Sequence, residues 1–503
     1  MRLYMPTVGK HALYAAFKAK DARFDGRFFV GVSSTGIYCR PVCRAKMPKE
    51  ENCTFYESAA AAEQAGYRPC LLCRPELAPG AAPVDATSAL AVRAARFLEE
   101  NCGSGQNIAE YGHRFGYSER HLRRAFMTEF HVSPVQYLQT CRLLLAKNLL
   151  TDTNISMTDV AMAAGFGSLR RFNALFREHY RMPPSAFRKQ IVARKDQAEN
   201  VTVLLGYRPP YQWEEMLRFL AQRAIPGVEK VADNAYFRTV YQPASAKNAP
   251  ELKGWLRVGH TPEKNALAVT VSPALMPFLS QLLARVRQLF DLHCDPDSVY
   301  ETLVAMNSMR PGLCVHGTRL PGSFEPFEMA VRAILGQQVT VKAASTLAGR
   351  LATNLGVPID TGMDGLTHAF PAAQAILTLG NDAASRLGSL GVTQTRANSI
   401  IALASCVANG EVEFSPCLQP EAEIQKLTCI PGIGVWTAHY IAMRAMNWPD
   451  AFPHTDLGVK KALAPISGKE ILRMAEAWRP WRAYATINLW NFLSRQTTEK
   501  TRQ

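Results

Sequence analysis

The chain has 503 residues, 48% of them hydrophobic, and a formal net charge of +15 at pH 7. This length predicts three or four domains, and no apolar run approaches the roughly 18 residues that a membrane span requires. Residues 1–84 carry 12 Lys and Arg against 7 Asp and Glu, and residues 85–195 carry 16 against 9. A polyanion is therefore the expected partner of the first two-fifths, although the excess charge can also serve solubility.

The N-terminal segment lacks the apolar core of an export signal, because charges interrupt "MRLYMPTVGKHALYAAFKAKDARFDG". We therefore expect a cytoplasmic protein whose 12 cysteines stay reduced. Clustered cysteines then indicate metal binding or catalysis rather than a disulfide framework.

The first two motifs are cysteine pairs, in "TGIYCRPVCRA" (35–45) and "GYRPCLLCRPE" (66–76). They have C-x3-C and C-x2-C spacing, and 26 residues separate them. Zinc prefers thiolates in a closed tetrahedron, and each short loop supplies two of them on one side. We predict one Zn²⁺ site, with buried thiols or a redox pair as alternatives. The expected ligands are Cys39, Cys43, Cys70 and Cys73.

Residues 11–80, with "FVGVSSTGIYCRPVCRA" and "FYESAAAAEQAGYRPCLLCRPE", resemble the N-terminal domain of Ada-type activators of the bacterial adaptive response. The resemblance implies that Cys39 takes a methyl group irreversibly from a methylphosphotriester in DNA, and that zinc keeps its sulfur a reactive thiolate. Cys53 lies outside the pattern and is interpreted as a core thiol. A second Ada-type methyltransferase motif, Pro-Cys-His-Arg, is absent, so repair of O6-methylguanine is not expected. The arginines expected to hold the DNA backbone are Arg40, Arg44, Arg68 and Arg74.

The small, Pro-rich stretch "LAPGAAPVDATS" (77–88) predicts a linker, and the pattern from 89 to 190 is helical. Within it, "GYSERHLRRAFMTEFHVSP" (116–134) is echoed by "GFGSLRRFNALFREHYRMPP" (165–184). Each copy predicts a helix, a glycine turn and a second helix, the helix-turn-helix plan. For one copy a plain helical hairpin is the alternative, but two copies favour DNA binding. The second helices carry cations that can reach phosphates and base edges: Arg120, Arg123, Arg124, Arg170 and Arg171.

Residues 89–190 resemble the paired helix-turn-helix domain of AraC-type transcription activators. The resemblance implies that both recognition helices enter successive major grooves of DNA. Beyond it the pattern is mixed: "NALAVTVSP" (265–273) predicts a strand, and "PALMPFLSQLLARVRQLFDL" (273–292) predicts an amphipathic helix. With "LLGYRPPYQWEEMLRFLAQRAIPGVEKVAD" and "ARVRQLFDLHCDP", residues 203–315 resemble the N-terminal domain of the AlkA-type 3-methyladenine glycosylases. From about 316 the sequence is almost wholly helical.

"LTCIPGIGVWTAHYIAM" (427–443) predicts two helices joined at Gly432 and Gly434, whose backbone N–H groups can bind one DNA phosphate. A tight turn between core helices is the alternative. Asp456 follows in "FPHTDLGVKKAL", and "RAILGQQVTV" (332–341) and "WRPWRAYATINLW" (478–490) extend the pattern. With these motifs, residues 316–497 resemble the helix-hairpin-helix glycosylases, which remove damaged bases from DNA.

That resemblance makes Asp456 the carboxylate that stabilises an oxocarbenium-like sugar while an alkylated, cationic purine leaves. Its alternative is a helix N-cap before "LGVKKAL". Aromatic rings would attract a cationic base, although each can equally be helical core. The rings that match the family's pocket are Trp436, Tyr440, Trp481 and Phe219.

Three further positions refine the resemblance. Trp436 stands where lyase-competent relatives have a Lys, so Schiff-base chemistry is not expected. No cysteine follows Cys429, which excludes the C-terminal iron–sulfur cluster of some relatives. Gln338 stands where AlkA-like enzymes insert a Leu into the duplex, so base flipping and lesion range are expected to differ.

The sequence therefore predicts a multidomain protein, mainly α with α+β parts. The expected domains are a zinc-binding α/β domain (1–80), an all-α double helix-turn-helix domain (86–192), an AlkA-like α+β domain (200–315) and an all-α helix-hairpin-helix glycosylase domain (316–503). We expect a bacterial, nucleoid-associated monomer that binds alkylated and promoter DNA, works with RNA polymerase and activates transcription besides repairing DNA. The alternatives are a damage-sensing transcription factor whose glycosylase half binds lesions without excision, and a constitutive repair enzyme.

Overall fold

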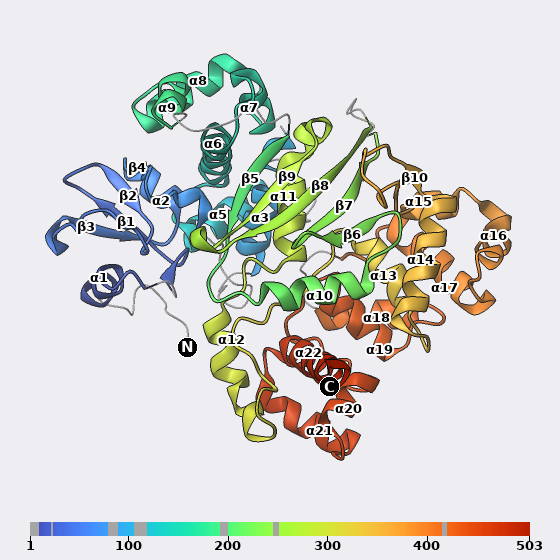
Figure 1. Ribbon diagram of the computed structural model, residues 1–503. Helices are drawn as coiled ribbons and strands as arrows, with labels where there is room; N and C mark the ends of the chain where they lie inside the picture. Colours follow the sequence, from blue (N-terminus) through green and yellow to red (C-terminus); the bar gives the residue numbers. More distant parts are fainter. Residues whose placement is uncertain are drawn as a thin grey trace. The chain divides into compact units, whose positions relative to one another are not determined.

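The computed structural model describes residues 10–21, 24–78, 89–104, 118–191, 200–244, 251–414 and 420–502 (Figure 1). The chain divides into two compact units. The first contains residues 1–209, 261–287 and 292–294, and the second contains residues 210–260, 288–291 and 295–503. Most of the expected linker (residues 79–88) and Gly116 of the first repeat lie outside the described residues. No helix in the described ranges is both long and apolar enough to cross a membrane.

The cysteine-rich region is a four-stranded sheet flanked by short helices, which confirms the expected α/β class. Its strands run in the order β3-β1-β2-β4; β1 pairs antiparallel with β2 and β3, and β4 lies parallel to β2. Phe28, Val30 and Cys53 pack in the core beside the cysteine pairs. The elements are α1 (Lys10–Lys18), β1 (Phe29–Val32), β2 (Ile37–Cys39), η3 (Glu50–Asn52), β3 (Cys53–Tyr56), α2 (Ala59–Gln64), β4 (Arg68–Pro69) and η4 (Pro75–Leu77).

The next region is helical, as the periodicity predicts, and serine caps set its helix starts. Ser118, Ser133, Ser156 and Ser168 each accept a hydrogen bond from a backbone N–H in the first turn. Gly165 has φ +81°, and a side chain there would lie 2.1 Å from the carbonyl oxygen of Cys102, so this turn requires glycine. The elements are α3 (Ala89–Glu100), η6 (Cys102–Ser104), α5 (Glu119–Phe130), α6 (Pro134–Asp152), α7 (Met157–Ala163), α8 (Leu169–Tyr180) and α9 (Pro184–Ile191).

The mixed segment contains the strand expected near 265–273, which is β9 (Ala266–Val271) and pairs with β5 (Val201–Gly206). In the second unit, β7 (Ala235–Gln242) pairs with β6 (Glu229–Ala232) and β8 (Leu252–Thr261). The single helix expected over 273–292 is wrong. Pro277 lacks an N–H, and the segment is instead η8 (Pro273–Phe278) followed by α11 (Leu279–Leu289). The other elements are α10 (Trp213–Arg223), η7 (Pro262–Lys264), α12 (Pro296–Leu303) and η9 (Val304–Ser308).

The last region is a helical assembly in which α13 packs against α14, α17 and α19 (Figure 1). Its helices are α13 (Pro326–Leu335), α14 (Val341–Leu355), α15 (Ala373–Leu377), α16 (Ala383–Ser389), α17 (Gln394–Ala408), α18 (Pro420–Cys429), α19 (Val435–Arg444), α20 (Leu457–Leu463), α21 (Gly468–Ala475) and α22 (Arg482–Arg502). Two short 3-10 turns, η10 (Gly380–Asp382) and η11 (Glu476–Trp478), connect some of them. It is not purely helical, because β10 (Val357–Pro358) pairs with β11 (His368–Ala369).

Candidate functional site

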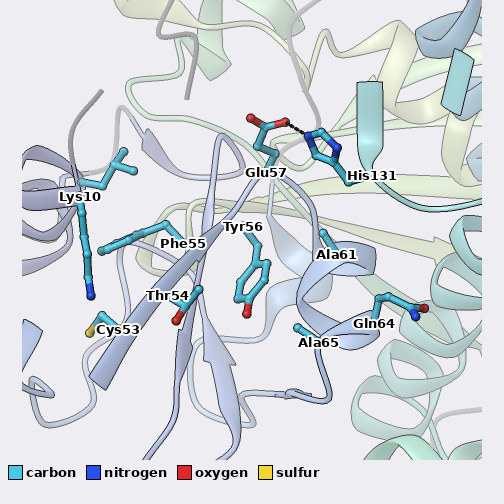
Figure 2. Close-up of a pocket in the computed structure, with 11 residues that line it drawn as sticks. Lys10, Cys53, Thr54, Phe55, Tyr56, Glu57, Ala61, Gln64, Ala65 and His131 are labelled. Carbon is cyan, nitrogen blue, oxygen red and sulfur yellow. Dashed lines mark ion pairs between the residues drawn. The ribbon is translucent and has the colours of Figure 1, made fainter. Parts of the chain in front are cut away.

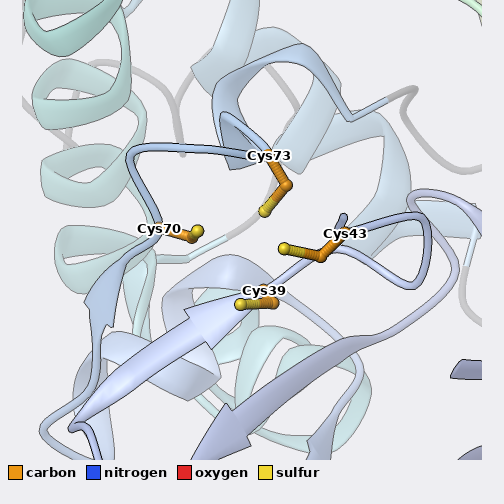
Figure 3. A group of neighbouring side chains, drawn as sticks. All are labelled: Cys39, Cys43, Cys70 and Cys73. Carbon is orange, nitrogen blue, oxygen red and sulfur yellow. The ribbon is translucent and has the colours of Figure 1, made fainter. Parts of the chain in front are cut away.

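The four predicted zinc ligands converge at one end of the N-terminal sheet (Figure 3). Their sulfur atoms all lie within 4.8 Å of one another, and three of the four residues are buried. Cys39 ends β2, Cys43 follows in the next loop, and Cys70 and Cys73 come from the loop after β4. Because β4 lies parallel to β2, with Tyr38 paired to Pro69, the two loops leave the same end of the sheet.

This arrangement fits a zinc ion. Zn–S bonds of about 2.3 Å in a tetrahedron place sulfur atoms about 3.8 Å apart, which the cluster accommodates. The hydrogen bond with Cys43 raises the pKa of Cys39, whereas the bond with Cys39 lowers the pKa of Cys70, so the thiols compete for protons. A cation would remove that competition. The backbone N–H of Arg40 also donates to the Cys73 sulfur at 3.3 Å, as expected for a metal-bound thiolate.

The neighbouring arginines differ in their environments. Arg40 is buried and donates to both carboxylate oxygens of Asp25 and to the carbonyl oxygen of Cys73. Arg74 forms ion pairs with Glu76 at 2.9 Å and Asp152 at 2.8 Å. Their positions argue against the predicted phosphate contacts at both residues, because their guanidinium groups already have buried carboxylate partners. Arg44 is exposed and Arg68 half-buried, so both keep access to a polyanion.

Cys53 is buried in the core as expected, but it also lines a cavity of about 610 Å³ (Figure 2). β3 and α2 form two of its walls, Lys10 of α1 closes another side, and His131 lies at its rim 3.8 Å from Glu57. None of the predicted site residues lines this cavity.

The second helix of each helix-turn-helix copy presents its cations to solvent. Phe126 of α5 and Phe172 and Phe176 of α8 are fully buried. The opposite face of each helix therefore points to solvent. The predicted DNA contacts all lie on those outward faces: Arg120, Arg123, Arg124, Arg170 and Arg171. This is the amphipathic arrangement that a recognition helix requires.

In the second unit, Asp456 is the N-cap of α20 and also the centre of a polar cluster. One carboxylate oxygen accepts from the backbone N–H of Val459 at 3.0 Å and from the indole N–H of Trp490 at 2.8 Å. The other accepts from the indole N–H of Trp436 at 3.1 Å. The capping and catalytic interpretations are therefore compatible, because the same carboxylate caps the helix and is oriented by two indoles.

Aromatic rings extend from this carboxylate. Trp436 stacks on Tyr440 with centroids 5.3 Å apart and an 8° interplanar angle. Tyr440 lies 6.1 Å from Trp490, which in turn stacks on Phe219 at 6.3 Å. Three of the four predicted rings thus lie together around Asp456. Trp481 does not join them in these contacts, because it packs edge-on against Tyr484 at 5.5 Å and is only 4% exposed.

Trp490 takes the place that the sequence assigned to Trp481. Space for its ring comes from Gly458, where a side chain would lie 2.8 Å from Trp490 Cδ1. An indole N–H can donate to a carboxylate, and a glycine two residues after Asp456 leaves room for the ring. Those two signals could have indicated Trp490, which ends the motif "WRPWRAYATINLW".

Arginines also surround the rings, which the sequence did not predict. The guanidinium carbon of Arg223 lies 3.8 Å from the Phe219 centroid, and that of Arg444 lies 4.7 Å from it. Burial favours the neutral phenol, but Arg444, Arg223 and Arg332 hold the pKa of Tyr440 below its ordinary value. Burial lowers the pKa of Arg444 to about 10. The Phe219 ring is therefore already occupied by the guanidinium groups of Arg223 and Arg444. The stacked rings of Trp436 and Tyr440 are more accessible to a cationic base, because both are only half-buried.

The hairpin between α18 and α19 has the expected glycine geometry. Gly432 has φ +84°, and a side chain there would lie 2.1 Å from Ser399 Oγ. Gly434 is the exposed N-cap of α19 and leaves open space where a side chain would be. Gln337 ties this turn to the expected insertion loop, because its amide donates to the Gly432 carbonyl oxygen at 2.8 Å. Gln338, beside it, is exposed with φ +53°.

Comparison with protein families divides the chain into the same succession of parts. Residues 12–76 match the metal binding domain of Ada, and residues 111–190 match a helix-turn-helix domain. Residues 202–325 match the AlkA N-terminal domain, and residues 331–481 match the HhH-GPD superfamily of base excision DNA repair proteins. These matches confirm the four predicted kinds of domain in their predicted order.

Individual relatives cover nearly the whole chain or one part of it. A Mycobacterium tuberculosis protein described as a probable bifunctional transcriptional activator/DNA repair enzyme AlkA is 35% identical over 491 residues, which are 95% of this chain and 96% of the relative. DNA-3-methyladenine glycosylase 2 of Escherichia coli is 35% identical over 57% of this chain and 95% of its own length. The bifunctional transcriptional activator/DNA repair enzyme Ada of Escherichia coli is 33% identical over 29% of this chain and 40% of its own length.

Proposed function

The chain belongs to the family of bifunctional transcriptional activators and DNA repair enzymes, and from this premise we propose that it both senses and repairs alkylated DNA. The four-cysteine cluster takes a methyl group from a DNA methylphosphotriester onto Cys39. The Asp456 site excises alkylated purines of the 3-methyladenine type. The helix-turn-helix region places the methylated protein, as a monomer, on promoter DNA for RNA polymerase.

In the methyl transfer, the Cys39 sulfur attacks the methyl carbon while the bond from that carbon to the phosphate oxygen breaks. The phosphodiester leaves as an anion with the bonding electron pair, and Cys39 becomes a thioether. One Zn²⁺ bound by the four cysteines would keep the sulfurs deprotonated at neutral pH. Arg44 and Arg68 are the cations available to hold the backbone, because Arg40 and Arg74 are engaged by buried carboxylates.

Base excision rests above all on the fixed position of Asp456. Two indole N–H groups and one backbone N–H hold the carboxylate beside a stacked pair of rings. When the glycosidic bond breaks, the base leaves with the electron pair and positive charge develops on the sugar, which a fixed carboxylate stabilises. Water then adds to the sugar carbon and Asp456 can accept its proton. With Trp436 at the lyase position, the product is an intact abasic site.

One experiment tests both activities. Wild-type protein is incubated with methylated duplex DNA, and mass spectrometry of protein and DNA records Cys39 methylation and free 3-methyladenine together. A methylated Cys39 peptide and released base are expected, with no strand nick before alkali treatment. Methylation without base release would instead support a lesion-binding transcription factor. Borohydride trapping of a protein–DNA adduct would contradict the intact abasic product.

A further inference from the structure

Helix α6, which lies between the two recognition helices in the sequence, supplies a buried cation to the loop that carries two of the cysteines. Lys147 of α6 is 1% exposed. Its ammonium group forms an ion pair with Glu76 and lies 3.4 Å from the carbonyl oxygen of Cys70. A buried ammonium group costs free energy unless it is paired, so the burial of Lys147 depends on its ion pair with Glu76. Glu76 follows Cys73 by three residues, and Lys147 thus binds both ends of the cysteine loop.

The same loop has a second anchor on α6. Arg74 follows Cys73 directly and donates to Asn148 at 2.8 Å and to both carboxylate oxygens of Asp152. The side chain of Arg74 is 15% exposed and that of Asp152 is 8% exposed. Burial opposes ionisation of Glu76, yet Lys147 and Arg74 hold its pKa below the ordinary value. Two cations and two carboxylates therefore compensate one another within one buried cluster.

The other cysteine pair is connected to the same helix through α2. Tyr38, the neighbour of Cys39 in β2, donates to Glu63 at 3.0 Å. Glu63 also accepts from Thr140 of α6 at 3.0 Å, and its carboxylate lies 3.6 Å from His179 near the end of α8. Both cysteine loops thus reach α6, the helix between the two recognition helices, through buried polar contacts rather than through apolar packing alone.

We propose that Lys147 is a positioning residue for the methyl-acceptor site, so that α6 of the helix-turn-helix region completes the cysteine cluster. This inference rests on the proposed function, in which the cluster holds zinc. Lys147 fixes the Cys70 carbonyl and Glu76, and through them the direction of the Cys70 and Cys73 sulfurs. Any displacement of this loop is transmitted to α6, and so to the segment that connects the two recognition helices.

Zinc release from the full-length protein to a chromogenic chelator tests the positioning role. Lys147→Met should release zinc about tenfold faster or more, because the loop loses its charged anchor, which corresponds to about 1.4 kcal/mol. Lys147→Arg keeps the positive charge and should release zinc more slowly than Lys147→Met. Lys189→Met, at an exposed lysine of α9, is the matched control and should not differ from wild type. Equal release from Lys147→Met and wild type would overturn the inference.

Lys147→Met leaves the buried Glu76 carboxylate with Arg74 as its remaining cation in the described contacts, so a second variant guards against simple misfolding. Lys147→Met/Glu76→Gln removes both charges, and its zinc should still leave faster because Cys70 has lost its donor. Hydrogen exchange in the wild type gives an independent measure: chelating zinc should speed exchange over residues 143–152 of α6 but not over α9. Unchanged exchange in α6 would contradict the coupling. A wild-type protein that binds no zinc would refute the proposed methyl-acceptor function itself. That outcome differs from zinc binding that is indifferent to Lys147, which would refute only the positioning role.

Discussion

The cysteine cluster and the Asp456 site are built over different sequence distances, and this difference explains how well each could be predicted. The four cysteines fall within 35 residues, on two loops at one end of a small sheet. The residues around Asp456 come from α10, α19, α20 and α22, so their chain positions run from Phe219 to Trp490. The spacing of cysteines that are close in sequence directly indicates which of them can meet. The residues around Asp456 meet only through the packing of distant helices, which their spacing in the sequence does not reveal.

Polar partners differ between the two sites as well. Around the cysteines, buried arginines pair with carboxylates of the protein, as Arg40 does with Asp25. Around Asp456, the carboxylate is held by neutral indoles and forms no ion pair in the described contacts. The first arrangement stabilises the fold, and the second leaves charge available for chemistry. The Arg40 and Asp456 variants below separate these two roles.

The largest effect on stability is expected at Arg40. Arg40→Ala leaves Asp25 buried without its cation, and loss of one partner of a buried pair costs about 3–5 kcal/mol. Arg44→Ala, at the exposed arginine four residues later, should change stability by less than about 0.5 kcal/mol and weaken DNA binding instead. Urea unfolding, monitored through zinc release, measures the stability of the two variants. DNA titration at several salt concentrations measures their affinity for DNA. Equal stabilities would contradict the structural role of Arg40.

Asp456→Asn should lose about 100-fold or more in base excision, because a neutral amide cannot stabilise developing positive charge. Asn is as good an N-cap as Asp, so α20 and lesion binding should be retained. Single-turnover release of 3-methyladenine measures the rate, and Asp364→Asn, at an exposed aspartate of the same unit, is the control. A wild-type rate would mean that Asp456 is a helix cap alone.

Glu63 makes the stability of the first unit depend on pH. Burial raises its pKa from 4.5 to about 7, although hydrogen bonds from Thr140 and Tyr38 oppose the shift. The unfolded chain loses this proton near pH 4.5 and the folded chain near pH 7, so stability falls as the pH rises between these values. Lys147 and His179 also face this carboxyl group, and burial lowers the pKa of His179.

Glu63→Gln should therefore be more stable than wild type at pH 8, by up to about 3 kcal/mol, and similar to it near pH 4.5. Thermal unfolding at both pH values measures the difference, with Glu51→Gln, at an exposed glutamate, as the control. A pH-independent difference would show that Glu63 does not titrate in this range.

Much of the fold could be read from the sequence, and the misses have physical causes. The fifty-residue repeat predicted the helices that became α5 and α8, and serine caps, which were not used as a signal, begin both of them. Pro277 divided a segment whose apolar periodicity looked continuous. The burial of Arg40 and Arg74 could not be foreseen, because their partners Asp25 and Asp152 lie 15 and 78 residues away. A charged side chain beside a functional residue does not reveal whether it faces DNA or a carboxylate of its own chain.

The assignment of Trp481 rather than Trp490 is the sharpest case, and a pair of variants decides it. Trp490→Phe keeps an aromatic ring against Phe219 but removes the N–H that donates to Asp456 at 2.8 Å. A hydrogen bond to a charged group contributes about 1.5–3 kcal/mol, and part of that loss should appear as poorer orientation of Asp456. We expect excision about tenfold slower. Trp481→Phe alters the packing against Tyr484 and should lower stability while leaving the rate per folded molecule within about twofold. Single-turnover excision, corrected for the folded fraction, compares them; a larger loss at Trp481 would restore the sequence assignment and remove Trp490 from the site.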